Sequence, residues 1–138
     1  MMSTPWAFSP DGKQVVSGGG HWGGGMFISA RDQARFGLFT LRDGNWGGKQ
    51  LLAKEWFDWA RTPGPANSTY GFMNFMLNVP SENGGKRYPS APDSAWAHLR
   101  NGTNMIYCDP ENDLVVVARW LDTAREGEVF AAIADSVG

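Results

Sequence analysis

The sequence is poor in the groups that build covalent or metal-linked frameworks. Its one cysteine, Cys108, excludes an intramolecular disulfide and a zinc site made of several thiolates. The two histidines, His21 and His98, are the only imidazoles, and neither forms a close ligand pair with the cysteine or with the other histidine. We therefore predict no metal site and no cofactor.

The sequence also lacks a strong excess of charge and a long apolar run. The net charge is −2 at pH 7, so there is no basic field of the kind that holds a nucleic-acid backbone. No stretch approaches the roughly 20 apolar residues that span a bilayer. Residues 1–6 show neither the basic nor the apolar region of a signal peptide. We expect no nucleic-acid partner and no membrane span, and both a periplasmic and a cytoplasmic location stay open.

What the chain does contain is typical of a folded domain. Apolar residues make up 42% and charged residues 19% of its 138 residues, the reverse of a disordered composition. This length suits one domain and is too short for two. Six glycines fall within residues 18–25. Residues 1–25 are therefore interpreted as a glycine-rich lead-in, with a short strand predicted at 13–16.

Residues 26–62 are predicted to be helical. Ser29 and Asp32 match a capping box, and Gly44 stands where the C-terminus of that helix is expected. A second helix is predicted over residues 49–61, because the proline-rich turn that follows it supplies no amide hydrogen. Its apolar residues are expected to form one buried face: Leu52, Trp56, Trp59 and Ala60.

Residues 70–121 are predicted to form strands. The apolar segment 70–78 is bounded by turn residues, and three later segments have strand composition: 94–99, 104–108 and 113–120. A turn at residues 109–112, with proline at its second position, joins the last two. The continuous β-branched run at 114–117 predicts a strand buried on both faces.

Residues 122–138 are predicted to form a C-terminal helix. Thr123 and Glu126 match a second capping box, and Phe130, Ile133 and Val137 share one helix face. The order of elements, two helices, then strands, then one helix, indicates an α+β fold. We expect an antiparallel strand meander with flanking helices, in a single partial domain that spans residues 1–138.

The residues alone establish no catalytic centre. There is no Gly-x-Ser-x-Gly elbow, and the carboxylates within residues 109–113 fall in a turn, where solvation is expected. His98 is the one histidine on a predicted strand and hence the one candidate base. An independent enzyme would have to pair it with Ser94 or Tyr107 as nucleophile, and the spacing does not support this arrangement.

Two ordered groups of motifs have a familiar pattern. The first is Gly-Gly-Gly-Met-Phe-Ile-Ser-Ala-Arg-Asp-Gln-Ala-Arg-Phe-Gly at residues 23–37, followed by Trp-Gly-Gly-Lys-Gln-Leu-Leu at 46–52. The second is Tyr-Gly-Phe at 70–72, then Asn-Gly-Thr-Asn-Met-Ile-Tyr at 101–107 and the Asp-Pro-Glu and Leu-Val-Val-Val motifs within 109–117. Their combination resembles the C-terminal third of the serine β-lactamase-like hydrolases, which include class C β-lactamases, D-alanyl-D-alanine carboxypeptidases, other penicillin-binding-protein-like enzymes and related esterases. The resemblance implies the C-terminal part of the β-lactamase/transpeptidase-like fold.

The chain departs from that family at its catalytic motifs. Complete members carry Ser-x-x-Lys, a Tyr-x-Asn or Ser-x-Asn element and a Lys-Thr-Gly or His-x-Gly element. The chain contains no Ser-x-x-Lys and no Tyr-x-Asn. Its Ser-x-Asn match at residues 81–83 follows the segment that it should precede, so the second element has no counterpart either. The third has its counterpart at residues 98–100, where Arg100 replaces the glycine. By position, the resemblance implies that His98 lies beside the substrate carboxylate or the catalytic hydrogen-bond network, and that the amide of Asn101 is one oxyanion-hole donor.

Two roles follow from this comparison. In the first role, the chain is the C-terminal segment of a serine hydrolase that acts on small-molecule amides, esters or peptides. Such a segment would come from a truncated gene, a split chain or a processed product. We expect it to be inactive alone. Its sheet would lack N-terminal strands, so we expect a bare edge, and either self-association or dependence on a missing N-terminal portion. The alternative is a free-standing, non-catalytic binding or scaffold module derived from the same fold, which would hold a peptide or a glycan.

Overall fold

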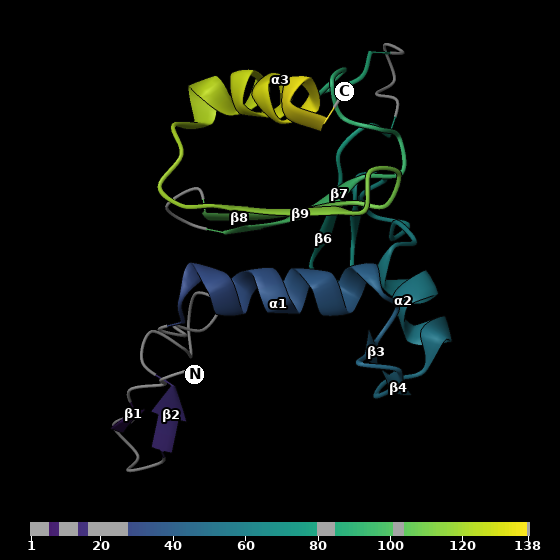
Figure 1. Ribbon diagram of the computed structural model, residues 1–138, viewed down its shortest axis with the longest axis vertical. Coiled ribbons are helices and arrows are strands. Elements are labelled where there is room, and N and C mark those ends of the chain that lie inside the picture. Colours follow the sequence, from purple (N-terminus) through teal and green to yellow (C-terminus); the bar gives the residue numbers. More distant parts are fainter. Residues whose placement is uncertain (1–5, 9–13, 17–27, 80–84, 101–103, 138) are drawn as a thin grey trace.

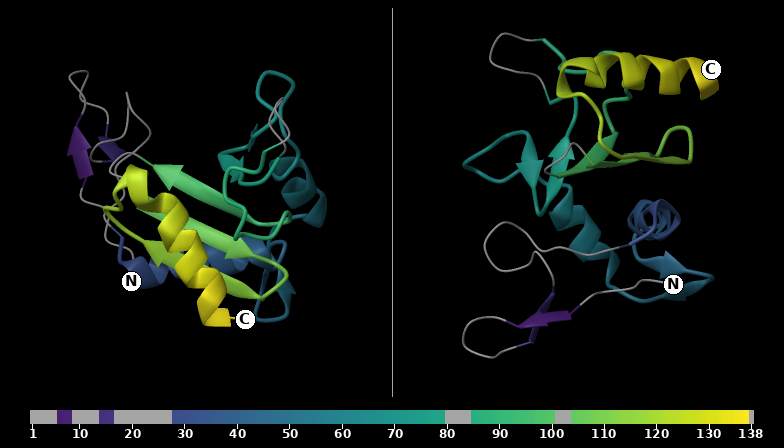
Figure 2. Two further views of the ribbon diagram at one scale, coloured as in Figure 1. Left: turned by 90° about the horizontal axis from the view of Figure 1, so that it is seen from above. Right: turned by 90° about the vertical axis from the view of Figure 1, so that its left-hand side faces the viewer.

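The computed structural model shows an α+β fold in three layers (Figure 1). It describes residues 6–8, 14–16, 28–79, 85–100 and 104–137. The central layer is a five-stranded sheet, helix α1 (Ala30–Leu41) lies across one face, and helix α3 (Glu126–Val137) lies across the other. The views in Figure 2 show the same layering, with α3 running obliquely over the strands. The predicted antiparallel meander with flanking helices is therefore confirmed at the level of architecture.

The sheet is a simple meander in which every neighbouring pair is antiparallel. Its strands follow sequence order, namely β5 (Tyr70–Gly71), β6 (Asn74–Met76), β7 (Trp96–Arg100), β8 (Asn104–Asp109) and β9 (Leu114–Ala118). The long pairs are β7–β8, where His98 faces Ile106, and β8–β9, where Cys108 faces Val115. Strand β7 is therefore the middle strand, and β9 lies at one edge.

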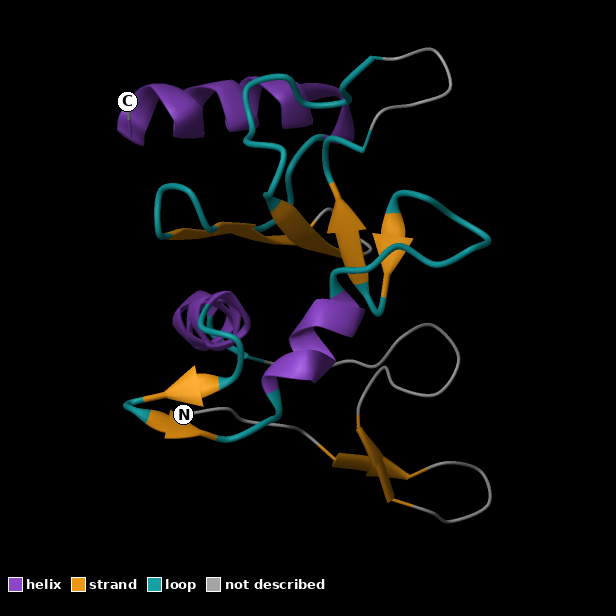
Figure 3. Cartoon of the chain, turned by 90° about the vertical axis from the view of Figure 1, so that its right-hand side faces the viewer, coloured by secondary structure: helices purple, strands orange, loops and turns teal. Residues whose placement is uncertain are grey.

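Two small two-stranded sheets lie outside this meander. Strand β1 (Trp6–Phe8) pairs with β2 (Gln14–Val16), which confirms a strand in the predicted segment 13–16. Strand β3 (Asn45–Trp46) pairs with β4 (Lys49–Gln50) (Figure 3). The rest of the glycine-rich lead-in falls outside the described residues.

Helix α1 begins as the capping box predicts and packs on the sheet through a glycine. The Ser29 side chain caps the helix by accepting a hydrogen bond from the Asp32 amide at 3.1 Å. Gly37 is buried, and a Cβ atom at this position would lie 2.6 Å from Val115 Cγ1 and 2.8 Å from Ile106 Cγ2. The absence of a side chain at Gly37 is what lets the helix approach β8 and β9 so closely.

The end of α1 differs by one position from the prediction. Asp43, and not Gly44, is the first left-handed residue after the helix, with φ 49°. The amides of Asp43 and Gly44 donate to the carbonyls of Thr40 and Phe39 at 3.2 and 2.9 Å, the pattern of a Schellman motif. Gly44 follows with φ +80°, and a Cβ there would lie 2.5 Å from Phe57 Cε2, so glycine is required on both grounds.

The predicted helix over residues 49–61 is wrong in its first half. Gly47 and Gly48 have φ of +60° and +85°, a turn that folds the chain into the β3–β4 hairpin instead of a helix. The Gln50 side chain then donates to the carbonyls of Asp43 and Leu52 at 2.5 and 2.6 Å and holds this segment extended. Helix α2 therefore spans only Lys54–Ala60.

The predicted buried face of this helix is also largely wrong. Phe57 and Ala60 are each 2% exposed and form the buried side of α2. The other three residues assigned to that face, Leu52, Trp56 and Trp59, are exposed. The seven-residue helix has two turns, so it offers the rest of the molecule one narrow stripe, and Phe57 occupies it by packing edge-on against Phe39 of α1 and against Trp56.

The apolar segment 70–78 is two strands and not one. A turn at Phe72 and Met73 separates β5 from β6, and Met73 has φ 64°. Both side chains are exposed in that turn. Apolar composition therefore predicted the strand type and missed the reversal, because no glycine or proline stands at the turn itself.

Strands β8 and β9 are joined at the predicted turn, where a buried carboxylate organises the backbone. Asp109 is 1% exposed, and its oxygens accept hydrogen bonds from the amides of Glu111 and Asn112, the Asn112 side chain and the Tyr107 hydroxyl at 2.8–3.1 Å. Strand β9 itself is half-buried at all five residues. Residues of β9 contact both helix-covered faces, but the predicted strand buried on both faces is not found, because β9 lies at the edge of the sheet and none of its residues is buried.

Helix α3 closes the second face of the sheet over the main apolar core. Asp122, and not Thr123, caps the preceding 3₁₀ turn (Thr123–Arg125), and Phe130 and Ile133 face the sheet while Val137 is exposed. The eight buried residues of this core come from the sheet, the connection before β7 and the helix: Leu77, Tyr88, Ala91, Ala95, Ala97, Met105, Tyr107 and Phe130.

Glu126 is buried at the start of α3 and accepts a hydrogen bond from the Tyr88 hydroxyl. Burial and this bond raise the pKa of Tyr88 to about 12.

None of the helices in the described part of the chain combines the length and the apolar character needed to cross a bilayer.

Candidate functional site

His98 occupies the middle of the central strand, on the face that α1 covers. Side chains alternate along a strand, so His98 shares its face of β7 with Trp96 and points away from Ala97 and Leu99, which pack in the core under α3. The imidazole lies beside the Phe36 ring of α1, with ring centroids 5.3 Å apart. The side chain is half-buried.

The β5–β6 turn reaches the same imidazole from the other side. Nδ1 of His98 lies 3.3 Å from the carbonyl oxygen of Met73, a distance suited to an Nδ1–H donor. That tautomer would leave Nε2 as the basic nitrogen. His98 is thus held between an aromatic side chain of α1 and the backbone of the turn, and Phe36 and Met73 at its borders are 47% and 45% exposed.

The turn that carries Met73 is fixed to α2. The Asn74 side chain, which is buried, donates to the carbonyls of Ala60 and Phe72, each at 2.9 Å. A Cβ atom on Gly71 would lie 2.5 Å from the Ala60 carbonyl oxygen, so only glycine allows this approach. The Tyr70 hydroxyl bonds to Met73 Sδ at 3.1 Å. The carbonyl that faces His98 is therefore held by the end of a helix.

The structure does not bring a nucleophile to His98 from the two side chains considered in the sequence. The Ser94 hydroxyl lies before β7 and donates to Glu111 Oε1 at 2.7 Å. The Tyr107 hydroxyl points to the other face of the sheet, where it donates to Asp109 Oδ2 at 3.0 Å and its ring packs against Phe130. Burial, followed by the charge of Asp109, raises the pKa of Tyr107 well above its usual value, which disfavours a phenolate.

The second residue of the expected site, Asn101, lies outside the described residues. The expectation that its amide serves as an oxyanion donor therefore stays a prediction.

Cys108, the one cysteine of the chain, is not available as a nucleophile. Its Sγ is fully buried on the α1 face, 3.7 Å from both the Thr40 hydroxyl and the Gly37 carbonyl oxygen. Burial raises the pKa of the thiol to about 11, so it stays protonated near neutral pH. Cys108 is a packing residue beneath α1.

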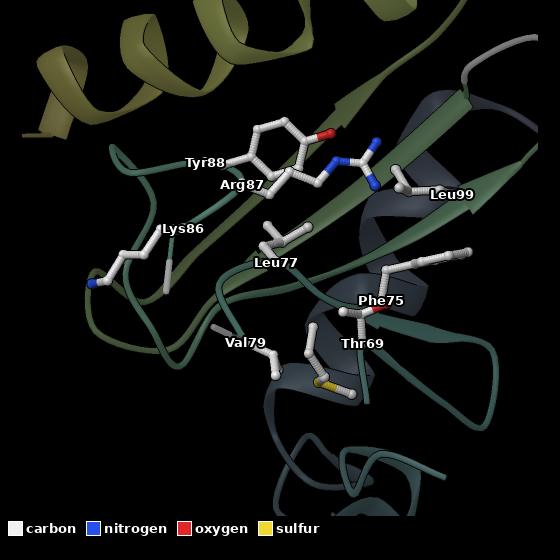
Figure 4. Close-up of a pocket in the computed structure, with 10 residues that line it drawn as sticks. Thr69, Phe75, Leu77, Val79, Lys86, Arg87, Tyr88 and Leu99 are labelled. Atoms are coloured by element: carbon white, nitrogen blue, oxygen red, sulfur yellow. The ribbon is translucent and has the colours of Figure 1, made fainter. Parts of the chain in front are cut away.

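A separate cavity of about 440 Å³ lies on the opposite, α3 side of the sheet (Figure 4). Its apolar wall includes Phe75, Leu77 and Leu99, and its rim carries Lys86 and Arg87. Figure 4 shows Arg87 lying along the Tyr88 ring, with its guanidinium 5.1 Å from the ring centroid. Both cations have acidic neighbours, Asp93 at 2.5 Å from Lys86 and Glu126 at 3.7 Å from Arg87. Sequence reasoning missed this cavity, because its residues come from Thr69 before β5, from β6 and β7 and from the loop between these two strands, and they share no motif.

The described residues contain no group of three or more histidine, cysteine, aspartate or glutamate side chains placed to hold a metal ion. What the site offers is a half-buried imidazole with an exposed aromatic and thioether border, on the middle strand of a sheet that lies between α1 and α3. Comparison with known proteins adds no assignment. No protein-family model matches the chain, and no curated protein shows significant sequence similarity to it.

Proposed function

We propose that this chain is the C-terminal portion of a β-lactamase-like serine hydrolase, and that it does not form an acyl-enzyme by itself. The observation that carries the proposal is the position of the motif at residues 98–100. It lies on the middle strand of an antiparallel sheet, with its histidine on the face opposite the C-terminal helix. Strand β6 pairs with β7 only at Trp96 and Ala97, so we infer that the part of β7 beyond Ala97 presents its edge to a catalytic serine that another segment supplies.

The chemistry of the site supports both the hydrolase assignment and the expectation that this chain forms no acyl-enzyme by itself. The half-buried imidazole of His98 is oriented by the contact between its Nδ1 and the Met73 carbonyl, and an oriented imidazole is suited to a hydrogen-bonding role in the proposed site. Acyl transfer also needs a nucleophile within hydrogen-bond reach of a base. Neither Ser94 nor Tyr107 provides it, since each of their hydroxyl groups bonds to a carboxylate elsewhere.

The purified chain is therefore expected to remain unlabelled by a fluorescent penicillin and by a fluorophosphonate probe. Covalent labelling is measured on a denaturing gel, with the heat-unfolded chain as the background. A label that disappears when one serine of this chain is replaced would overturn the proposed inactivity.

The family assignment has its own test. We expect a preceding segment or a companion chain to encode Ser-x-x-Lys and Tyr-x-Asn, and the assembled protein to hydrolyse a p-nitrophenyl ester. In that assembly His98→Ala should lower kcat/KM roughly tenfold or more, whereas the control Ser94→Ala should leave it unchanged. Equal activity of His98→Ala and the unmodified protein would remove His98 from the site.

A second candidate function is a non-catalytic binding module, favoured by the exposed apolar side chains around the same histidine. Phe36, Phe72 and Met73 are 45–58% exposed, and two of the three directly border His98. Such a border suits stacking against a peptide side chain or a sugar ring.

This candidate predicts that unlabelled peptide and oligosaccharide pools shift the NMR signals of His98 and Met73. Phe36→Ala should abolish those shifts, while the exposed control Trp59→Ala should retain them. The binding function would be contradicted by spectra that stay unchanged at saturating concentrations of both pools.

A further inference from the structure

We propose that Asn74 is a positioning residue for His98, and that its side chain sets which nitrogen of the neutral imidazole carries the proton. The proposal goes beyond the hydrolase assignment and holds whether or not the chain belongs to that family. It links the end of α2 to the candidate site through one reversal of the backbone, the β5–β6 turn at Phe72 and Met73.

A backbone carbonyl oxygen selects one form of the imidazole that it contacts. The Met73 carbonyl oxygen lies 3.3 Å from Nδ1 of His98, and a carbonyl oxygen can only accept a hydrogen bond. The contact is therefore a hydrogen bond only when Nδ1 carries a proton. It favours the Nδ1–H form of the neutral ring over the Nε2–H form, so whatever fixes this carbonyl also fixes the tautomer of His98.

Asn74 fixes the position of this carbonyl from inside the molecule. Its side chain is buried, and the amide nitrogen donates to the carbonyls of Phe72 and Ala60, each at 2.9 Å. The first bond holds the turn in a conformation in which Met73 has φ 64°, a value that a methionine rarely adopts. The second bond ties the turn to α2. We therefore expect the Met73 carbonyl to move away from Nδ1 when the Asn74 amide is removed.

The end of α2 is completed by this amide. The last four carbonyls of an α-helix have no partner inside the helix. In α2, three of them accept hydrogen bonds at 2.7–3.1 Å from the two residues that follow the helix, namely the carbonyls of Phe57, Asp58 and Trp59. The fourth, that of Ala60, accepts its hydrogen bond from Asn74. The turn is thus placed relative to α2 by a bond that the end of the helix requires.

The tautomer can be read from the imidazole nitrogen signals of His98 in 15N NMR spectra. They are recorded at about pH 8.5, where an imidazole of ordinary pKa is neutral, and are assigned by their loss in His98→Gln. The unmodified chain should show a protonated Nδ1. In Asn74→Ala, the ratio of the Nδ1–H form to the Nε2–H form should fall roughly fivefold or more, the factor that one ordinary hydrogen bond supplies.

Asn78→Ala is the matched control. Asn78 is also buried, and its side chain also holds a loop, since it donates to the Ala91 carbonyl at 2.6 Å and accepts from the Tyr88 amide at 3.0 Å. These two partners belong to the core under α3. Asn78→Ala should therefore lower the stability of the chain, as Asn74→Ala does, and leave the nitrogen signals of His98 unchanged.

Gly71→Ala displaces the same turn and leaves Asn74 in place. A Cβ atom on Gly71 would lie 2.5 Å from the Ala60 carbonyl oxygen, so the turn must move away from α2. Strand β5 is at the edge of the sheet and pairs only with β6, so the other strands keep their pairing. We expect the same fall in the Nδ1–H form of His98. Circular dichroism checks that each variant is folded, and Gly71→Ala decides the proposal if Asn74→Ala is not.

Three results would overturn the proposal. The first is a neutral His98 that carries its proton on Nε2 in the unmodified chain. The second is a folded Asn74→Ala or Gly71→Ala chain whose His98 signals match those of the unmodified chain, and the third is an equal change in Asn78→Ala. None of these results concerns the nucleophile or the preceding segment, so the hydrolase assignment would stand if the positioning role failed.

Discussion

Replacing Phe130 with alanine is expected to lower the free energy of unfolding by about 3–5 kcal/mol, the largest effect among the substitutions considered. Phe130 is 2% exposed and is the main anchor of α3 on the sheet. Its ring lies 4.4 Å from the Tyr88 ring and 5.3 Å from the Tyr107 ring, measured between centroids. Removing it leaves a cavity between two tyrosines whose hydroxyl groups are bonded to Glu126 and Asp109, so neither ring is free to fill the space.

The measurement is urea unfolding followed by circular dichroism. Val137→Ala is the matched control, because Val137 belongs to the same helix and is exposed, and it should change stability by less than about 0.5 kcal/mol. A loss for Phe130→Ala no larger than that of Val137→Ala would show that α3 does not depend on this anchor. Separation of the helix signal from the sheet signal during unfolding would indicate that α3 detaches as a unit.

Replacing Gly37 with leucine is expected to cost about 3 kcal/mol, because the helix must move away from the sheet. A Cβ atom alone would approach Val115 Cγ1 to 2.6 Å and Ile106 Cγ2 to 2.8 Å, and the rest of the leucine side chain has less space still. Gly37→Ala should also be destabilising, since the close contact outweighs the gain of about 1 kcal/mol that alanine usually brings to a helix.

Gly127 provides the control for this pair of substitutions. It lies in the first turn of α3, and a Cβ atom there would meet nothing within 4 Å. Gly127→Ala should therefore stabilise the chain by about 0.5–1 kcal/mol through helix propensity alone. Both changes replace glycine by alanine in a helix, so opposite signs isolate the sheet contact. Stabilisation by both would contradict the packing of α1 described here.

The local sequence determined most of the secondary structure. Ser29 and Asp32 predicted the start of α1, and the turn after Asp109 predicted the reversal between β8 and β9. These signals were readable because each one bonds to a backbone group within three residues, so the information needed lies in a short stretch of chain. The strands within residues 94–120 and the C-terminal helix were predictable from composition and apolar spacing, which are also properties of short stretches of chain.

Tertiary contacts decided which apolar residues are buried. Trp56, Trp59 and Phe57 look alike as a sequence pattern, yet only Phe57 meets a partner helix, and Trp59 is left 64% exposed. The split of residues 70–78 into two strands was hidden in the same way, because the turn at Met73 is held by Asn74 bonding to the distant carbonyl of Ala60.

The candidate site also has features that the sequence determined and features that only the tertiary structure decided. The sequence by itself determined that His98 lies on a strand, and it excluded a disulfide framework, because composition and alternation depend on the chain alone. Only the tertiary structure decided that this histidine faces α1, with its Nδ1 against the Met73 carbonyl, while Tyr107 faces α3. The face that a strand presents to each helix follows from how the layers pack, and packing joins residues that lie far apart in the sequence.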